Sequence, residues 1–186
     1  MSGGLGAFKN FIARESVRYN LVMSRTSAIK GDQLTNALQI LGVHFLLGRQ
    51  SKDGSLHKQP QRLIAALALS NESRLRLSLI PLFLEHPEFC VHVRTVAKKL
   101  NPSARLTLQC YYSAAVWLGQ KYQPHRKSVP DYFSKELNLV PTTDLEKNLY
   151  ELAKRHKELS GAQVDWLGTY QHAAQIWQKG LELQKG

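Results

Sequence analysis

Hydrophobic residues recur every three or four positions along most of this chain, which is the spacing of one face of an α-helix. Leu34, Leu38 and Leu41 follow this spacing near the start, and Leu149 and Leu152 follow it near the end. The alternation of apolar and polar residues that is typical of a β-strand is hardly seen. The pattern therefore predicts an all-α fold, a bundle of about eight or nine helices. The predicted helices cover residues 7–23, 32–47, 61–69, 72–85, 87–100, 102–122, 131–137, 145–160 and 164–183.

Prolines, glycines and capping residues indicate where these helices begin and end. Pro81 lies near the middle of the fourth predicted helix, which its missing N–H should kink or split. Asn101 and Pro102 are a capping residue and a first-turn proline, the arrangement that begins a helix. Residues 143–146, Thr-Asp-Leu-Glu, have the spacing of a capping box, and Gly48 should end the second helix.

A basic linker divides the chain into two parts. This linker covers residues 123–130 and is bounded by Pro124 and Pro130. We expect a basic helical bundle over residues 1–122, a linker region with a short helix over 123–142, and an antiparallel helical hairpin over 143–186. The hairpin should pack on the bundle, so that the whole chain forms one compact domain.

Positive charge is concentrated in the first two thirds of the chain. Residues 1–127 contain 18 Lys and Arg against 6 Asp and Glu, whereas residues 128–186 contain 7 against 8. The formal net charge of the whole chain is +11. A surface this positive attracts polyanions, because each phosphate that it neutralises releases condensed counterions. We therefore expect nucleic acid as a partner, contacted through its backbone.

Two groups of basic residues have the spacing of a helix face. Arg14, Arg18 and Arg25 lie four and seven residues apart on one stripe that begins on the first predicted helix, and a solvated face is the alternative interpretation. The second group, within residues 94–99, follows the short turn at residues 86–87. A DNA-reading helix-turn-helix is therefore an alternative to a packed pair of helices. The residues predicted to contact phosphates are Lys9, Arg14, Arg18, Arg25, Lys30, Arg94, Lys98, Lys99, Arg105, Arg126 and Lys127.

No catalytic or metal-binding motif accompanies these basic residues. The seven histidines include no pair at positions i and i+4, and neither Cys90 nor Cys110 has a second cysteine nearby. Only six carboxylates precede residue 128, which is too few for a two-metal nuclease. We therefore predict a protein that is not an enzyme and that uses no cofactor and no metal. An enzyme with an unrecognised site would need a cleft with perturbed titratable groups.

The cysteines and the apolar segments predict where the protein resides. Both cysteines lie in apolar helical patterns, which favours buried thiols over a disulfide and suits a reducing cytoplasm. The first residues lack the charged lead and apolar stretch of a signal peptide. No apolar run approaches the roughly 20 residues that cross a bilayer. We expect a cytoplasmic protein with no membrane partner.

Three segments resemble a known group of proteins. They are Arg74–Glu88, Tyr111–Leu118 and Asp165–Tyr170. These segments resemble uncharacterised all-helical prokaryotic proteins associated with genes for small nucleotidyltransferases in toxin–antitoxin and defence neighbourhoods. The resemblance covers residues 60–180 and rests on packing motifs, so it implies no functional residue.

Two functions remain open at this point. The first is a non-catalytic basic subunit that contacts nucleic-acid phosphates in a prokaryotic RNA- or DNA-handling complex. Small helical subunits of CRISPR effector complexes share its size range and charge. The second is a protein-interaction module, an antitoxin-like partner of a nucleotidyltransferase. In that case Trp166 and Trp177 on the C-terminal hairpin would be the anchors for a protein partner.

Overall fold

The structure is a computed structural model, and it describes residues 29–43, 55–126 and 129–183. Every regular element in these ranges is a helix, so the predicted all-α class is confirmed. The helix predicted over residues 7–23 lies outside the described residues, and the expected total of eight or nine helices stays a prediction. Within the described ranges, none of the helices combines the length and apolar character needed to cross a lipid bilayer.

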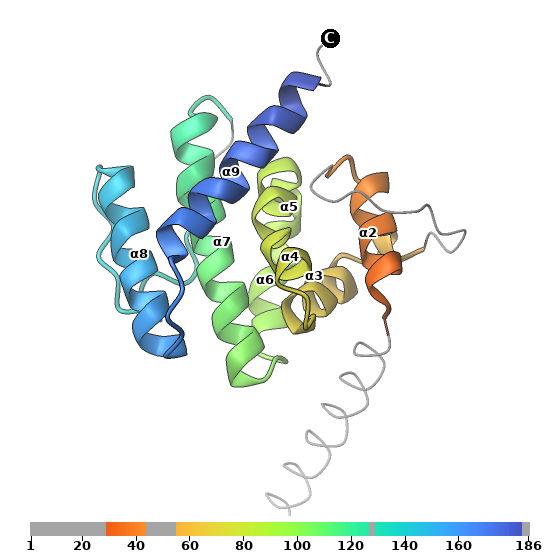
Figure 1. The fold of residues 1–186 in the computed structure, drawn as a ribbon, viewed down its shortest axis with the longest axis horizontal. Helices are drawn as coiled ribbons and strands as arrows, with labels where there is room; N and C mark the ends of the chain where they lie inside the picture. The colour runs from red at the N-terminus through yellow and green to blue at the C-terminus, as the bar shows by residue number, and fades with distance from the viewer. Residues whose placement is uncertain (1–28, 44–54, 127–128, 184–186) are drawn as a thin grey trace, which may run out of the picture.

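The long helix α7 (Pro102–Tyr122) forms the centre of the fold (Figure 1). It begins as predicted, because the Asn101 side chain accepts a hydrogen bond from Ala104 N at 2.9 Å and Pro102 occupies the first turn. Every residue from 108 to 118 is buried, so this helix needs neighbours on all sides. α5 and α8 supply most of that cover.

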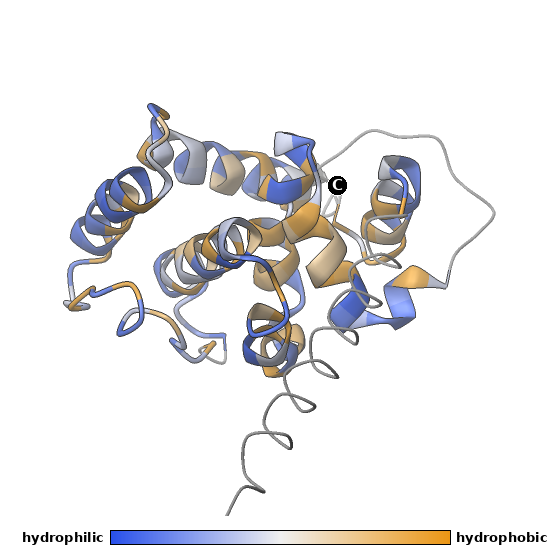
Figure 2. Ribbon diagram, turned by 90° about the horizontal axis from the view of Figure 1, so that it is seen from below, coloured by the Kyte–Doolittle hydropathy of each residue, from blue (hydrophilic) through white to orange (hydrophobic). Residues whose placement is uncertain are grey.

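The helices α3, α5, α6, α8 and α9 contact α7, whereas α2 packs farther out against η1, α3 and α4. In Figure 2 the central helices carry most of the hydrophobic colouring, whereas α8, at one end, is largely hydrophilic. The elements are α2 (Gly31–Ile40), η1 (Leu56–Lys58), α3 (Pro60–Leu69), α4 (Ser73–Leu77), α5 (Leu79–Glu85), η2 (Pro87–Phe89), α6 (Cys90–Ala97), α8 (Leu145–Ser160) and α9 (Trp166–Leu183).

The break between α4 and α5 confirms the prediction made from Pro81. The two helices are separated by Ser78, three residues before the proline. The proline has no N–H for the hydrogen bond that would continue α4, and the Ser78 hydroxyl donates to the carbonyl of Leu75 at 2.6 Å. The split allows the short helix α5, which is buried from Leu79 to Leu84, to lie against α7.

Two predicted helix ends are wrong. The second predicted helix ends at Ile40 and not at Gly48, because Gly42 turns the chain with a φ of 74°. The helix predicted over residues 87–100 begins with the 3₁₀ turn η2, and its α-helical part α6 ends at Ala97.

The short helix predicted over residues 131–137 is also wrong, because this segment is a turn. The Asp131 side chain accepts hydrogen bonds from the backbone N–H groups of Phe133 and Ser134. An aspartate that satisfies two successive backbone donors stabilises a turn in competition with a helix. Asn138, with a φ of 55°, then redirects the chain.

The helices α8 and α9 follow each other through a short turn, and α9 crosses α7 obliquely to reach α5 (Figure 1). Gly161, with a φ of 66°, ends α8. The predicted capping box is wrong in register. Asp144, not Thr143, caps α8, and Glu146 forms an ion pair with Lys121 of α7.

We expect Asp144→Ala to lower the free energy of unfolding by about 1 kcal/mol. The Asp144 carboxylate accepts a hydrogen bond from Lys147 N at 3.0 Å, and alanine leaves that N–H without its acceptor. Asp144→Asn retains an acceptor and should retain most of the stability. Urea unfolding measures both variants, and equal midpoints for Asp144→Ala and the parent protein would contradict the capping role.

Candidate nucleic-acid interface

The charge asymmetry of the sequence persists in the described part of the chain. Residues 55–126 contain ten Lys or Arg and three Asp or Glu, whereas residues 129–183 contain six and eight. Two stretches, residues 54–71 and 89–130, contain no Asp or Glu at all. These stretches include all of α3, α6 and α7, so basic side chains there have few local carboxylates as partners.

Five cationic side chains of η1, α3 and the end of α6 form what we name the α3/α6 basic face. They are Lys58, Arg62, Arg94, Lys98 and Lys99, and all five are exposed. Arg94 and Lys98 lie one helical turn apart, on the side of α6 opposite the buried residues Val93 and Val96. The helical period thus places buried valines inward and cations outward.

Two observations show that α3 and α6 lie side by side and run in the same direction. At their starts, Gln61 Nε2 and His92 Nδ1 are 3.4 Å apart. At their ends, Ser70 and Asn101 line the same cleft. The cations of the two helices therefore lie on neighbouring elements.

None of these five cations has an ion pair within the described ranges. The pairs present there join Arg74 to Glu72, His86 to Glu88, Lys121 to Glu146, and Arg155 to Glu158. Arg62 donates to the side chain of Gln59 at 2.7 Å, and the guanidinium of Arg94 lies 5.7 Å from the ring centre of Tyr132. Neither contact neutralises charge, so the basic face keeps its full positive charge.

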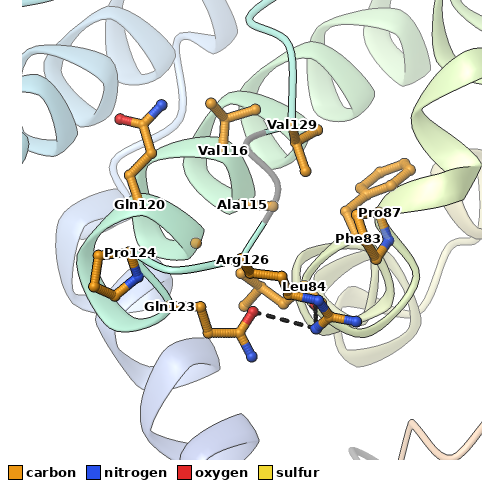
Figure 3. A pocket seen from close by; sticks show the side chains of 11 residues that line it. Phe83, Leu84, Pro87, Ala115, Val116, Gln120, Gln123, Pro124, Arg126 and Val129 are labelled. Atoms are coloured by element: carbon orange, nitrogen blue, oxygen red, sulfur yellow. Dashed lines mark hydrogen bonds between the residues drawn. The ribbon is translucent and has the colours of Figure 1, made fainter.

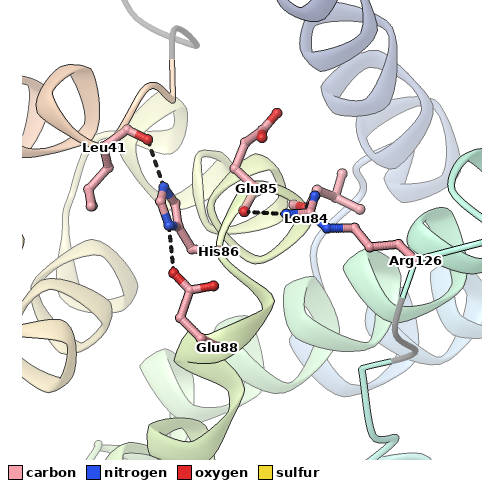
Figure 4. Close-up of polar contacts among 6 residues, drawn as sticks. All are labelled: Leu41, Leu84, Glu85, His86, Glu88 and Arg126. Atoms are coloured by element: carbon pink, nitrogen blue, oxygen red, sulfur yellow. Dashed lines mark hydrogen bonds and ion pairs between the residues drawn. The ribbon is translucent and has the colours of Figure 1, made fainter.

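Two of the predicted phosphate contacts make hydrogen bonds within the protein. Arg126 donates from Nη1 to the carbonyl of Leu84 at 2.8 Å and from Nη2 to the carbonyl of Glu85 at 2.9 Å (Figure 4). Arg105 donates to the carbonyls of Ala97 and Leu100, at the end of α6. Each guanidinium donates to carbonyl groups at or just after the end of a helix, where few backbone N–H donors are available.

Two further arginines also donate to backbone carbonyls, although the sequence did not single them out for it. Arg76 donates to the carbonyl of Ser70, just after α3, and Arg155 donates to the carbonyl of Leu137. A histidine does likewise. His86 Nε2 lies 2.7 Å from the carbonyl oxygen of Leu41, and Nδ1 lies 2.8 Å from Glu88 (Figure 4).

The other predicted site residues lie elsewhere. Lys30 is exposed just before α2, and its backbone N–H donates to the Gln33 side chain at 3.1 Å. The predicted phosphate contacts Lys9, Arg14, Arg18, Arg25 and Lys127 lie outside the described residues.

The two tryptophans predicted as partner anchors differ in their surroundings. Trp177 is only 6% exposed, and its Nε1 donates to the carboxylate of Glu85 on α5. Trp166 is half-buried, and its ring stacks on His156 with 3.6 Å between ring centres. In this arrangement Trp177 presents little surface to a partner, so its role as an anchor stays a prediction.

A small pocket lies between α5 and α7 (Figure 3). Its volume is about 140 Å³, and its walls include Phe83, Val116 and Val129, with the Arg126 side chain at its edge. Ligand pockets usually have volumes of about 300–1,000 Å³. No cluster of three or more His, Cys, Asp or Glu side chains suited to a metal ion occurs among the residues described.

No family model, curated protein or solved structure matches this chain. The resemblance to helical proteins associated with nucleotidyltransferases therefore stays a prediction.

Proposed function

We propose that this chain is a non-catalytic, nucleic-acid-binding subunit of an RNA- or DNA-handling complex, and that the α3/α6 basic face contacts the phosphate backbone. The observation that carries the proposal is the set of five exposed cations on neighbouring elements without a carboxylate partner. Lysine and arginine side chains neutralise phosphates without regard to sequence.

Backbone contact is favoured over base reading by the residues of this face. The exposed residues on α6 and directly after it are Val91, Arg94, Thr95, Lys98 and Lys99. Base reading typically uses bidentate Arg, Asn or Gln side chains on a helix that enters the major groove. A helix of eight residues whose two lysines follow its last turn is better suited to the outer surface of a nucleic-acid backbone.

A salt series of binding measurements tests the proposal. We expect the affinity for a labelled oligonucleotide to fall steeply with rising salt in fluorescence anisotropy. The variant Arg94→Gln/Lys98→Gln/Lys99→Gln should reduce the slope of log affinity against log salt by about 2 to 3, because each lost phosphate contact removes roughly 0.7 to 0.9.

The matched control removes the same charge from another surface. Lys147, Lys154 and Lys157 are exposed on α8, where acidic residues are interspersed. The variant Lys147→Gln/Lys154→Gln/Lys157→Gln should leave the slope nearly unchanged. A flat salt dependence of the parent protein, or equal losses in both triple variants, would contradict the proposed face.

A further inference from the structure

A cleft of about 660 Å³ is lined by residues from the end of α3, the first part of α7, the end of α8 and the start of α9. One wall is the end of α3 and the side chain of Arg76, and the floor is the first part of α7, including Tyr111. The opposite wall contains His156 from α8 and Trp166 from α9. This volume falls within the usual range of small-ligand sites.

The electrostatics of this cleft favour an anion. None of the described residues that line it is an Asp or a Glu, and Arg76 contributes a guanidinium. One nitrogen of this group donates to the carbonyl of Ser70, which leaves its other N–H groups for a ligand. The cleft also contains Pro102 and Ser103, the first residues of the 21-residue helix α7. The positive end of the α7 dipole adds to the charge of Arg76.

Tyr111 supplies a second, independent observation. Its side chain lines the cleft and is only 4% exposed, yet its hydroxyl has no hydrogen-bond partner among the described residues. The hydroxyl groups of the two other buried tyrosines are both satisfied, by Pro130 for Tyr112 and by His156 for Tyr170. The Tyr111 hydroxyl is not among the fully enclosed polar atoms of the described residues, so it is open to the cleft, where a ligand or a water molecule can accept its hydrogen bond.

The protonation state of Tyr111 suits a donor. Burial raises the pKa of Tyr111 to about 12, and the nearby positive charge of Arg76 acts against that increase. The hydroxyl is therefore protonated at neutral pH. On the facing wall, the Trp166 Nε1 donor is buried and has no hydrogen-bond partner. The Tyr111 hydroxyl and the Arg76 guanidinium thus belong to one cleft, and none of its described lining residues carries a carboxylate.

We propose that this cleft binds the phosphomonoester group of a nucleotide, with the Arg76 guanidinium and the Tyr111 hydroxyl as donors to the phosphate oxygens. The volume leaves room for more than a phosphate, and the aromatic side chains of Tyr111 and Trp166 offer apolar surface to a sugar and base. The site goes beyond the basic face and does not depend on it for a free nucleotide.

The same chemistry has two sources, a free mononucleotide or the phosphorylated end of a strand. Asn101 and Ser103 of the cleft follow Lys98 and Lys99 of the basic face within a few residues. A strand that lies on the α3/α6 basic face could therefore place its terminal phosphate in the cleft. Separate probes distinguish the two sources.

The resonance of the Trp166 indole N–H provides the first test. We expect inorganic phosphate and adenosine 5′-monophosphate to shift this resonance in ¹⁵N-correlated spectra of the full chain, with tighter binding of the nucleotide. Trp166→Phe assigns the resonance. Anisotropy with an oligonucleotide carrying a 5′-phosphate, compared with the same strand without it, tests the second source.

Two variants and one control locate the site. Arg76→Gln should weaken phosphate binding about tenfold or more, because a charge-assisted hydrogen bond is lost. Tyr111→Phe should weaken it several-fold without lowering the free energy of unfolding, since the hydroxyl has no partner to lose. Arg74→Gln is the control, because Arg74 is exposed, outside the cleft, and paired with Glu72.

The outcomes separate cleanly. A shift of the Trp166 resonance that the mononucleotide causes and that Arg76→Gln abolishes supports the site. A higher affinity for the strand with the 5′-phosphate, lost in the same variant, supports binding of the strand end. No response to any of the three phosphate probes at millimolar concentration overturns the proposal. A response that both Arg76→Gln and Tyr111→Phe leave unchanged also overturns it. Failure of the proposal for the α3/α6 basic face would appear differently, because the affinity for the unphosphorylated strand would then not depend on salt.

Discussion

Between pH 7 and pH 4 we expect the protein to lose about 3 kcal/mol of its free energy of unfolding through His156 alone. Burial lowers the pKa of His156 from its ordinary 6.5 to about 4. Between these two values the unfolded chain binds a proton that the folded chain does not. The stabilisation is therefore complete above pH 6.5 and is lost as the pH falls toward 4.

The surroundings of His156 explain why the folded protein holds it neutral. The residue is 2% exposed, and its ring stacks on that of Trp166 and meets the ring of Tyr111 edge to face. Its Nδ1 is 2.8 Å from the hydroxyl of Tyr170, which is itself buried. This neutral hydrogen bond satisfies one ring nitrogen but offers no negative charge to an imidazolium.

Urea unfolding at several pH values between 4 and 7 measures this effect. The variant His156→Phe/Tyr170→Phe removes both partners of the hydrogen bond, so that neither polar group is left alone in the core. Between pH 7 and pH 4 the free energy of unfolding of this variant should fall by about 3 kcal/mol less than that of the parent protein. His172→Gln, an exposed change on α9, is the control. Parallel pH profiles for the parent and the double variant would show that His156 does not titrate as described.

The helices that the sequence predicts well are those whose ends depend on local chemistry. The beginning of α7 at Pro102 and the break near Pro81 follow from a missing N–H and a capping side chain, which are properties of a few adjacent residues. The prediction of a helix over residues 131–137 is wrong for a local reason that hydrophobic spacing does not show. There the Asp131 side chain accepts hydrogen bonds from the backbone N–H groups of Phe133 and Ser134, and this arrangement stabilises a turn in place of a helix.

The same distinction between local causes and long-range packing applies to the candidate sites. The exposure of Lys98 and Lys99 follows from helical period, because the residues that face inward are valines and alanines. The cleft does not follow from any pattern in the sequence. Arg76 and His156 are 80 positions apart, and their meeting depends on how α4 and α8 pack around α7. Only folding brings such residues together.

Sequence alone does not show whether an arginine binds a ligand or the protein's own backbone, and Arg126 is an example. Its charge and its position in a proline-bounded linker predicted a phosphate contact. In the structure its guanidinium donates to two carbonyls at the end of α5, more than 40 positions earlier (Figure 4). A fork of two parallel donors matches the two adjacent carbonyls, which a lysine cannot do.

We therefore expect Arg126→Ala to lower the free energy of unfolding by about 2 kcal/mol, because two charge-assisted hydrogen bonds are lost and two helix-end carbonyls lose their donors. Arg126→Lys should restore less than half of that loss, although it keeps the charge. The same lysine variant should bind an oligonucleotide with an unchanged salt slope if a phosphate requires only charge at this position.

Arg62→Ala is the control, because Arg62 is exposed and donates only to the nearby Gln59. It should change the stability by no more than about 0.5 kcal/mol. If Arg126→Lys is as stable as the parent protein, a positive charge at this position is sufficient, and the paired hydrogen bonds to α5 do not contribute to stability. If it is destabilised, the arginine holds the linker against the end of α5 through its two hydrogen bonds.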